Sequence, residues 1–216
     1  MTLLQKAAVW ALPVLLAITL HEVAHGWAAL KLGDDTALQA GRLSLNPLRH
    51  VDLVGTLIVP LILLFVGGFL FGWAKPVPVD GRKLRQPRRD MALVAAAGPA
   101  SNLLMAAGWA LVAKLGFLLG AEWTWIAVPL ILAGAAGISI NLALAVLNLL
   151  PLPPLDGGRV LAGLLPLPLA RLLAALEPYG FFILLALLAL GWLGLILGPP
   201  LEWLRDGYID LFRLKS

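Results

Sequence analysis

The segment His21-Glu22-Val23-Ala24-His25 carries the residues of this chain best suited to chemistry. In a helix, residues four apart lie on one face, so His21 and His25 can bind a single tetrahedral zinc ion. Glu22 follows the first of these residues and is placed to accept a proton from water activated by the metal. The alternative is a pair of buried histidines satisfied by neighbouring helices, which leaves the adjacent carboxylate unexplained.

A catalytic zinc needs a third protein ligand, and this chain has no cysteine to supply it. Asp156 is the best candidate, because it ends a run whose prolines prevent regular helix and leave the chain free to bend toward a metal. A helix-ending loop with a solvated aspartate is the alternative. His50 is the only other histidine. It could replace Asp156 as a ligand, orient one of the ligands, or lie at the surface.

The elements that position these residues must be strongly apolar. Hydrophobic residues make up 61% of the 216 residues and charged residues 13%, against roughly 25% charged in a soluble domain. A soluble globule of this size could not bury so much apolar side chain, so the composition indicates a chain solvated by lipid. It excludes disorder, coiled coil and nucleic-acid binding. The net charge of +4 fits attraction to anionic lipid.

Apolar runs long enough to cross a bilayer recur along the chain. The runs and the predicted amphipathic tail helix cover residues 7–32, 53–74, 91–119, 124–150, 180–198 and 200–216. We predict an all-α polytopic membrane protein with about four to five transmembrane helices, in one membrane-embedded domain over residues 1–216. The histidines lie within 7–32, and the unit 124–157 joins the fourth run to the bend at Asp156.

The segment 53–74 decides where the two ligand segments end. If it crossed the bilayer, 7–32 and 124–150 would end on opposite faces and separate the ligands. If it dips in and returns, they end on the same face, and Gly55 and Pro60 permit such a break. The re-entrant alternative also places most Lys and Arg residues on one side. We favour it, with the active site nearer the cytoplasmic face.

Short β segments are predicted beside the active site. A peptide bond inside a helix is shielded, so a transmembrane substrate must unwind before it is cut. An edge strand of the enzyme could then hold the freed backbone by β-addition. Residues 41–45 and 73–79 are the candidates, and ordinary connecting loops are the alternative.

Three motifs together resemble one family. The H-E-x-x-H at 21–25 and the N-x-x-P-x-P-x-L-D-G at 148–157 resemble the site-2 protease family of intramembrane zinc metalloproteases. Gly98-Pro99-Ala100-Ser101-Asn102 is similar to that family's G-P-x-x-N helix. Many members insert a PDZ domain between the last two motifs, and here only a short connection joins those runs. The chain therefore resembles the small PDZ-less branch.

The resemblance implies one Zn²⁺ per chain, bound by His21, His25 and Asp156, with Glu22 as the catalytic acid and base. It implies that Asn148 lies near the zinc and contacts substrate or helps to stabilise the oxyanion. The remaining site candidates are Pro151 and Pro154 on the substrate side, and His50 and Asn102 as residues that support the ligands. Asn102 is alternatively expected to satisfy the backbone that Pro99 frees.

The resemblance also implies a transmembrane-protein substrate. The composition predicts a lipid-bilayer environment and no nucleic-acid partner. With no internal feature of a eukaryotic secretory protein, we expect a prokaryotic plasma membrane. Two other functions use the same residues. One is a membrane metal-binding protein or transporter, and the other is a catalytically inactive relative that binds transmembrane segments. The Glu22 carboxylate beside the two histidines favours a protease over both alternatives, because proteolysis needs a proton acceptor and metal binding alone does not. The sequence predicts neither a particular substrate nor an oligomeric state.

Overall fold

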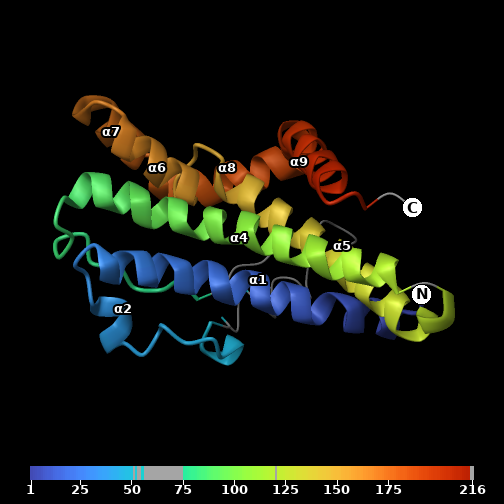
Figure 1. The fold of residues 1–216 in the computed structure, drawn as a ribbon. Helices are drawn as coiled ribbons and strands as arrows, with labels where there is room; N and C mark the ends of the chain where they lie inside the picture. The colour runs from blue at the N-terminus through green and yellow to red at the C-terminus, as the bar shows by residue number, and fades with distance from the viewer. Residues whose placement is uncertain (51, 53–54, 56–74, 120, 215–216) are drawn as a thin grey trace.

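The computed structural model describes residues 1–50, 52, 55, 75–119 and 121–214, which are helical and irregular and contain no strand. Three of their helices are long and apolar enough to cross a membrane: α1 (Leu3–Lys31), α4 (Pro87–Leu118) and α5 (Thr124–Asn148). They lie side by side, and α4 begins beside the end of α1 (Figure 1). The all-α class is confirmed.

Small and aliphatic residues form the contact between α4 and α5. Ala106 and Ala110 on α4 pack against Ile138 and Leu142 on α5 in one buried cluster. Lipid removes the hydrophobic drive between helices, so close approach of this kind is what stabilises a transmembrane pair. Large apolar side chains point outward instead, and Leu104 is 75% exposed. That outer surface is suited to contact with acyl chains.

Two polar connections, residues 33–50 after α1 and residues 75–86 before α4, meet at the end of α1. The first contains α2 (Thr36–Gln39) and η1 (Pro47–Arg49). Asp80 N–H donates to the buried Asp34 carboxylate at 2.7 Å, and Lys75 N–H donates to the His50 carbonyl at 2.9 Å. A hydrogen bond from Lys83 lowers the pKa of Asp35. The segment predicted as re-entrant, 53–74, lies almost entirely outside the described residues.

Four further helices follow α5. Residues 149–155 are irregular and lead into α6 (Asp156–Leu164), α7 (Leu167–Ala174), α8 (Glu177–Ala189) and α9 (Trp192–Leu211). The Arg88 guanidinium donates to the Ala162 carbonyl at 3.2 Å, so α6 runs back beside the start of α4. Helices α7 and α8 are bent by 63° and count as at most one span. The described residues therefore hold three candidate spans, or four with this bent pair.

The predicted span 180–198 is wrong as a single helix. Helix α8 ends at Ala189, Gly191 adopts φ 73°, and α9 begins at Trp192. A left-handed residue ends an α-helix, and glycine adopts that conformation without a steric cost. The predicted tail helix 200–216 is the second half of α9, which ends at Leu211 and is held to α4 by the Tyr208 hydroxyl on the Leu103 carbonyl.

The predicted β segments are not confirmed. Residues 41–45 and 75–79 are irregular, and 73–74 lie outside the described residues. Pro76 and Pro78 carry no N–H, and the N–H groups of Lys75 and Val77 are bound within the chain. Few donors are left in 75–79 for a β ladder.

Candidate active site

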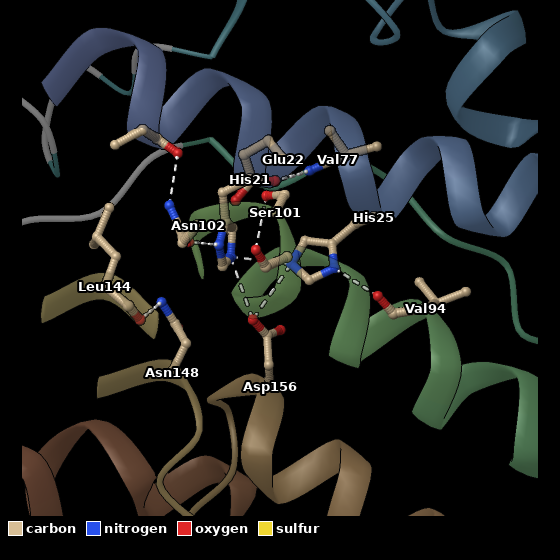
Figure 2. A network of polar contacts seen from close by, with 12 residues as sticks. His21, Glu22, His25, Val77, Val94, Ser101, Asn102, Leu144, Asn148 and Asp156 are labelled. Carbon is tan, nitrogen blue, oxygen red and sulfur yellow. Dashed lines mark hydrogen bonds and ion pairs between the residues drawn. The ribbon is translucent and has the colours of Figure 1, made fainter. Parts of the chain in front are cut away.

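His21, His25 and Asp156 converge between α1, α4 and α6 (Figure 2). Nε2 of His21 lies 3.0 Å from Nε2 of His25, and these atoms lie 3.2 and 3.4 Å from Oδ2 of Asp156. His21 and Asp156 are 8% and 9% exposed. The structure thus brings together the three residues that the sequence assigns to the metal. Asp156 is the first residue of α6 and does not sit in the irregular bend.

The hydrogen bonds around the imidazoles leave both Nε2 atoms as electron-pair donors. Nδ1 of His21 lies 2.6 Å from Oδ1 of Asn102, and Nδ1 of His25 lies 2.7 Å from the Val94 carbonyl. Both oxygens only accept hydrogen bonds, so each Nδ1 donates. Among the described residues, Oδ2 of Asp156 has no hydrogen-bond partner. Three electron pairs, two of them on buried residues and one on the partly buried His25, therefore face one another, and a cation between them would remove their repulsion.

The spacing of the three atoms fits a tetrahedral ion. Zinc binds imidazole nitrogen and carboxylate oxygen at about 2.0–2.1 Å, so two tetrahedral ligands lie about 3.3 Å apart. The three observed separations are 3.0, 3.2 and 3.4 Å. Nδ1–H bonds of the kind that Asn102 and Val94 accept fix ring orientation in metal sites. The residues present therefore fit zinc, with a fourth position left for water.

Gly98 is what lets the two imidazoles pack on α4. A Cβ at this position would collide with Cε1 and Nε2 of His25 and would lie 2.7 Å from Cε1 of His21. Glycine is therefore required by the close approach of two rings to a helix backbone. The sequence identified Gly98 as part of a motif and did not predict this contact.

Glu22 is anchored from outside its own helix. Its Oε2 accepts a hydrogen bond from the Val77 N–H at 2.8 Å (Figure 2). Val77 is 8% exposed, and its side chain packs near Gly26 on α1. The segment 75–79 therefore lies against α1 beside the three candidate metal ligands, His21, His25 and Asp156. The sequence did not predict this role, because every residue except proline has a backbone N–H and the residue type therefore does not identify this donor.

Asn148, Pro151, Pro154 and His50 are not among the three residues whose atoms converge. Asn148 ends α5, and its Nδ2 donates to the Leu144 carbonyl at 3.0 Å. Pro151 and Pro154 are exposed in the irregular segment before Asp156. The His50 ring donates to the Ser44 carbonyl at 2.8 Å and is not part of the metal-binding trio found among the described residues. It is 1% exposed, so the expectation that it lies at the surface is wrong.

Asn102 is brought to the metal group as a hydrogen-bond partner of His21. The alternative expectation, that it satisfies the backbone freed by Pro99, is wrong. A proline leaves the carbonyl four residues before it without a helical partner, which here is Ala95. The Asn102 amide nitrogen instead donates to the Ala17 carbonyl and to Asn141.

Comparisons with known proteins identify the family of this chain. A profile of peptidase family M50 matches residues 121–190. YwhC of Bacillus subtilis, which is named as a zinc metalloprotease, is 39% identical over 207 residues, covering 92% of this chain and 88% of the relative. The chain belongs to peptidase family M50, the site-2 protease family.

Two Rip2 proteins, also named as zinc metalloproteases, are longer M50 relatives. The one from Mycolicibacterium smegmatis is 34% identical over 81% of this chain and 64% of its own length. The one from Mycobacterium tuberculosis H37Rv is 32% identical over 80% of this chain and 63% of its own length. The chain thus spans less than two thirds of either Rip2 protein. No solved structure matches the chain.

Membership in M50 makes the chain a zinc metalloprotease with Zn²⁺ as its cofactor. The interpretation as a metal transporter is not retained, because the family is one of peptidases. Residues 119–123 alone join α4 to α5, and the small size fits the PDZ-less branch.

Proposed function

We propose that this M50 chain hydrolyses peptide bonds within transmembrane segments of other membrane proteins. The observation that carries the proposal is the convergence of three electron-pair donors from α1 and α6 next to the Glu22 carboxylate. His21, His25 and Asp156 are the proposed ligands of one zinc ion. The negative charge of Asp156 offsets part of the charge of the dication, which lowers the cost of burying it.

The chain's own residues supply the proton transfers. Bound zinc provides Lewis acidity, which makes water nucleophilic near neutral pH and polarises a peptide carbonyl. Glu22 accepts the proton of the attacking water and passes it to the leaving amine. The Val77 N–H holds Oε2 of Glu22, and we assign proton transfer to the other carboxylate oxygen.

Asn148, Pro151 and Pro154 form the proposed substrate side of the site. The Asn148 amide uses one N–H on the Leu144 carbonyl, and its second N–H is assigned to the oxyanion of the substrate. Pro151 and Pro154 are exposed between Asn148 and Asp156. They keep this stretch out of regular helix, and we assign the path for water and unwound substrate to it.

Recognition of the substrate backbone is assigned to residues 41–45. Of the two predicted segments, 75–79 has its Lys75 and Val77 N–H groups bound to His50 and Glu22, while Pro76 and Pro78 have none. The Lys75 and Pro76 carbonyls also accept from the Arg42 guanidinium, so few backbone groups of this segment are left for a substrate. In 41–45 the N–H groups of Gly41 and Arg42 are also bound, to the Leu38 and Ala37 carbonyls. The rest of this segment is the proposed candidate for β-addition to an unwound substrate.

The depth of the site supports cleavage inside the bilayer. His25 lies six residues before the end of α1, which is roughly 9 Å along the helix. The hydrogen bonds between the two polar connections support placing both on the side where α1 ends. By the positive-inside rule that side is cytoplasmic, because it gathers Lys31, Lys75, Arg82, Lys83, Arg85, Arg88 and Arg89.

Glu22→Gln tests the proposed function directly. We expect the variant to retain zinc and to cleave a model transmembrane peptide about 10²–10⁴-fold more slowly, because the proton acceptor is lost. Zinc content and cleavage should be measured on the purified wild type and variant, with and without a chelator. Wild-type turnover by Glu22→Gln, or cleavage that a chelator does not stop, would contradict the mechanism. Zinc binding without any wild-type cleavage would favour the inactive relative.

Val77→Pro tests the anchor on Glu22. Proline removes the N–H that bonds Oε2, while Val77→Ala keeps the N–H and removes most of the side chain. Hydrogen bonds to charged groups contribute about 1.5–3 kcal/mol, so we expect kcat for Val77→Pro to fall roughly 10- to 100-fold below that of Val77→Ala. Zinc content should be the same in both. Equal kcat values would show that the amide does not hold Glu22.

A further inference from the structure

Asn141 is a buried polar residue of α5 that touches neither zinc ligand of α1. It is 0% exposed, as is Asn102 on α4. Its Nδ2 donates to the Gly137 carbonyl at 2.8 Å, and its Oδ1 accepts from Nδ2 of Asn102 at 2.9 Å. Oδ1 of Asn102 in turn lies 2.6 Å from Nδ1 of His21. A line of hydrogen bonds therefore runs from the α5 backbone through α4 to the first imidazole.

The orientation of each side-chain amide in this line is fixed by the hydrogen bond that precedes it. The Gly137 carbonyl only accepts, so the nitrogen of the Asn141 amide must face it and the oxygen must face Asn102. That oxygen also only accepts, so the nitrogen of Asn102 faces Asn141 and reaches the Ala17 carbonyl at 3.2 Å with its other N–H. The oxygen of Asn102 is left for His21.

The last orientation decides which ring nitrogen of His21 has the lone pair. An amide oxygen at Nδ1 requires a proton on Nδ1, and the neutral ring then carries its lone pair on Nε2. Nε2 is the atom that faces His25 and Asp156. If the Asn102 amide turned over, its N–H₂ would face Nδ1 and would favour the opposite tautomer, whose Nε2–H cannot bind a metal.

We propose that Asn141 is a positioning residue of the metal site, which acts through Asn102 to keep the Nε2 lone pair of His21 directed at the zinc. The proposal rests on the proposed function in that it takes His21 as a zinc ligand. It assigns the selection of the tautomer to a residue on a third helix. Because Asn141 and Asn102 are both fully buried, water cannot replace the lost partner when either is removed.

A double-mutant cycle on the full chain in detergent tests the proposal. The quantity measured is the apparent dissociation constant for zinc, by competition with a chelator of known affinity. Loss of such supporting partners typically weakens metal binding about 10- to 100-fold. We expect about a 10-fold loss for Asn141→Leu and a loss of about 10- to 100-fold for Asn102→Leu. If Asn141 acts through Asn102, the double variant binds zinc as Asn102→Leu does.

Ser139→Ala is the matched control, because the Ser139 hydroxyl bonds the Ala135 carbonyl on the exposed side of the same helix. Its zinc affinity should equal that of the wild type. Wild-type affinity of Asn141→Leu, or losses that add in the double variant, would overturn the role of Asn141. Should Asn141→Leu fail to fold, Asn141→Ala removes the same two hydrogen bonds without adding bulk and carries the same expectation.

Asp156→Ala in the same assay separates this proposal from the function on which it rests. If Asp156→Ala loses zinc and the Asn141 variants do not, the metal site stands and the positioning role fails. If Asp156→Ala binds zinc as the wild type does, the proposed ligand set fails, and the role of Asn141 is still decided by the zinc affinity of its own variants.

A second readout needs no metal. The chain has three histidines, so the ¹⁵N spectrum of histidine-labelled, metal-free protein can be assigned by substitution. The wild type should show His21 with its proton on Nδ1, and Asn141→Leu should show the Nε2–H form. An unchanged tautomer in Asn141→Leu would overturn the proposal.

Discussion

Gly98→Ala is expected to abolish zinc binding and proteolysis by adding a single methyl group. The new Cβ would collide with the His25 ring and press on that of His21. Neither ring can simply swing away, because their Nδ1 atoms are held by Val94 and Asn102. Loss of ligand geometry should weaken zinc binding by at least about 100-fold, the upper end for removal of a supporting partner. The zinc content of purified protein and the cleavage of a transmembrane peptide are the measurements.

Gly108→Ala is the control for this substitution. Gly108 lies on the same helix, and an added Cβ there meets nothing within 4 Å. Alanine favours a helix over glycine by about 0.8–1.0 kcal/mol, so this variant should be at least as stable as the wild type and fully active. Full zinc content in Gly98→Ala would show that the imidazoles do not depend on this approach to α4.

Asp156→Ala is expected to remove zinc from the purified protein and to reduce cleavage below detection. A catalytic zinc site uses three protein ligands, and this variant keeps only two imidazoles. It also removes a carboxylate that lies within 3.4 Å of Nε2 of both histidines. Metal content, chelator competition and peptide cleavage should all report the loss together.

Asp206→Ala serves as the control, because its carboxylate is 65% exposed on α9 and pairs only with Arg205 among the ion pairs of the described residues. It should keep zinc and activity. If Asp156→Ala retained wild-type zinc affinity, the third ligand would have to be another residue. His50 is the alternative that the sequence offers, and His50→Ala would then have to lose the metal.

The candidate ligands could be identified from the sequence because ionisable side chains are unfavourable in a lipid environment. His21, Glu22, His25 and Asp156 are ionisable residues in or beside runs that lipid requires to be apolar. The spacing of the first three is local, so helix geometry alone places two imidazoles together. The fourth residue needed only a bend, which the prolines before it supply.

The hydrogen bonds that support the ligands could not be predicted in the same way. Asn141 was visible as a polar residue in the apolar run 124–150. Its partner depends on how α4 and α5 are rotated about their own axes, and nearly uniform apolar faces do not encode that rotation. The Val77 anchor uses a backbone N–H, so the identity of the side chain carries no information about it.

The C-terminal third shows the limit of hydropathy. Residues 180–198 are apolar throughout, so the pattern favours one span. The helix nevertheless breaks at Gly191 and continues through Pro199 and Pro200. A single left-handed residue redirects the chain without changing its mean hydropathy. The composition of an apolar run therefore predicts that it lies in lipid, but it does not predict where the helix ends or changes direction.

The order in which the ligands are synthesised has a consequence for the cell. Both imidazoles and Glu22 leave the ribosome on the first helix, whereas Asp156 begins α6 in the last third of the chain. A growing chain therefore carries Glu22 and both candidate histidine ligands long before Asp156 is synthesised. If His21, His25 and Asp156 are the ligands, the metal site is complete only when α6 has packed beside α4, so we expect proteolytic activity to arise only after most of the chain has been synthesised.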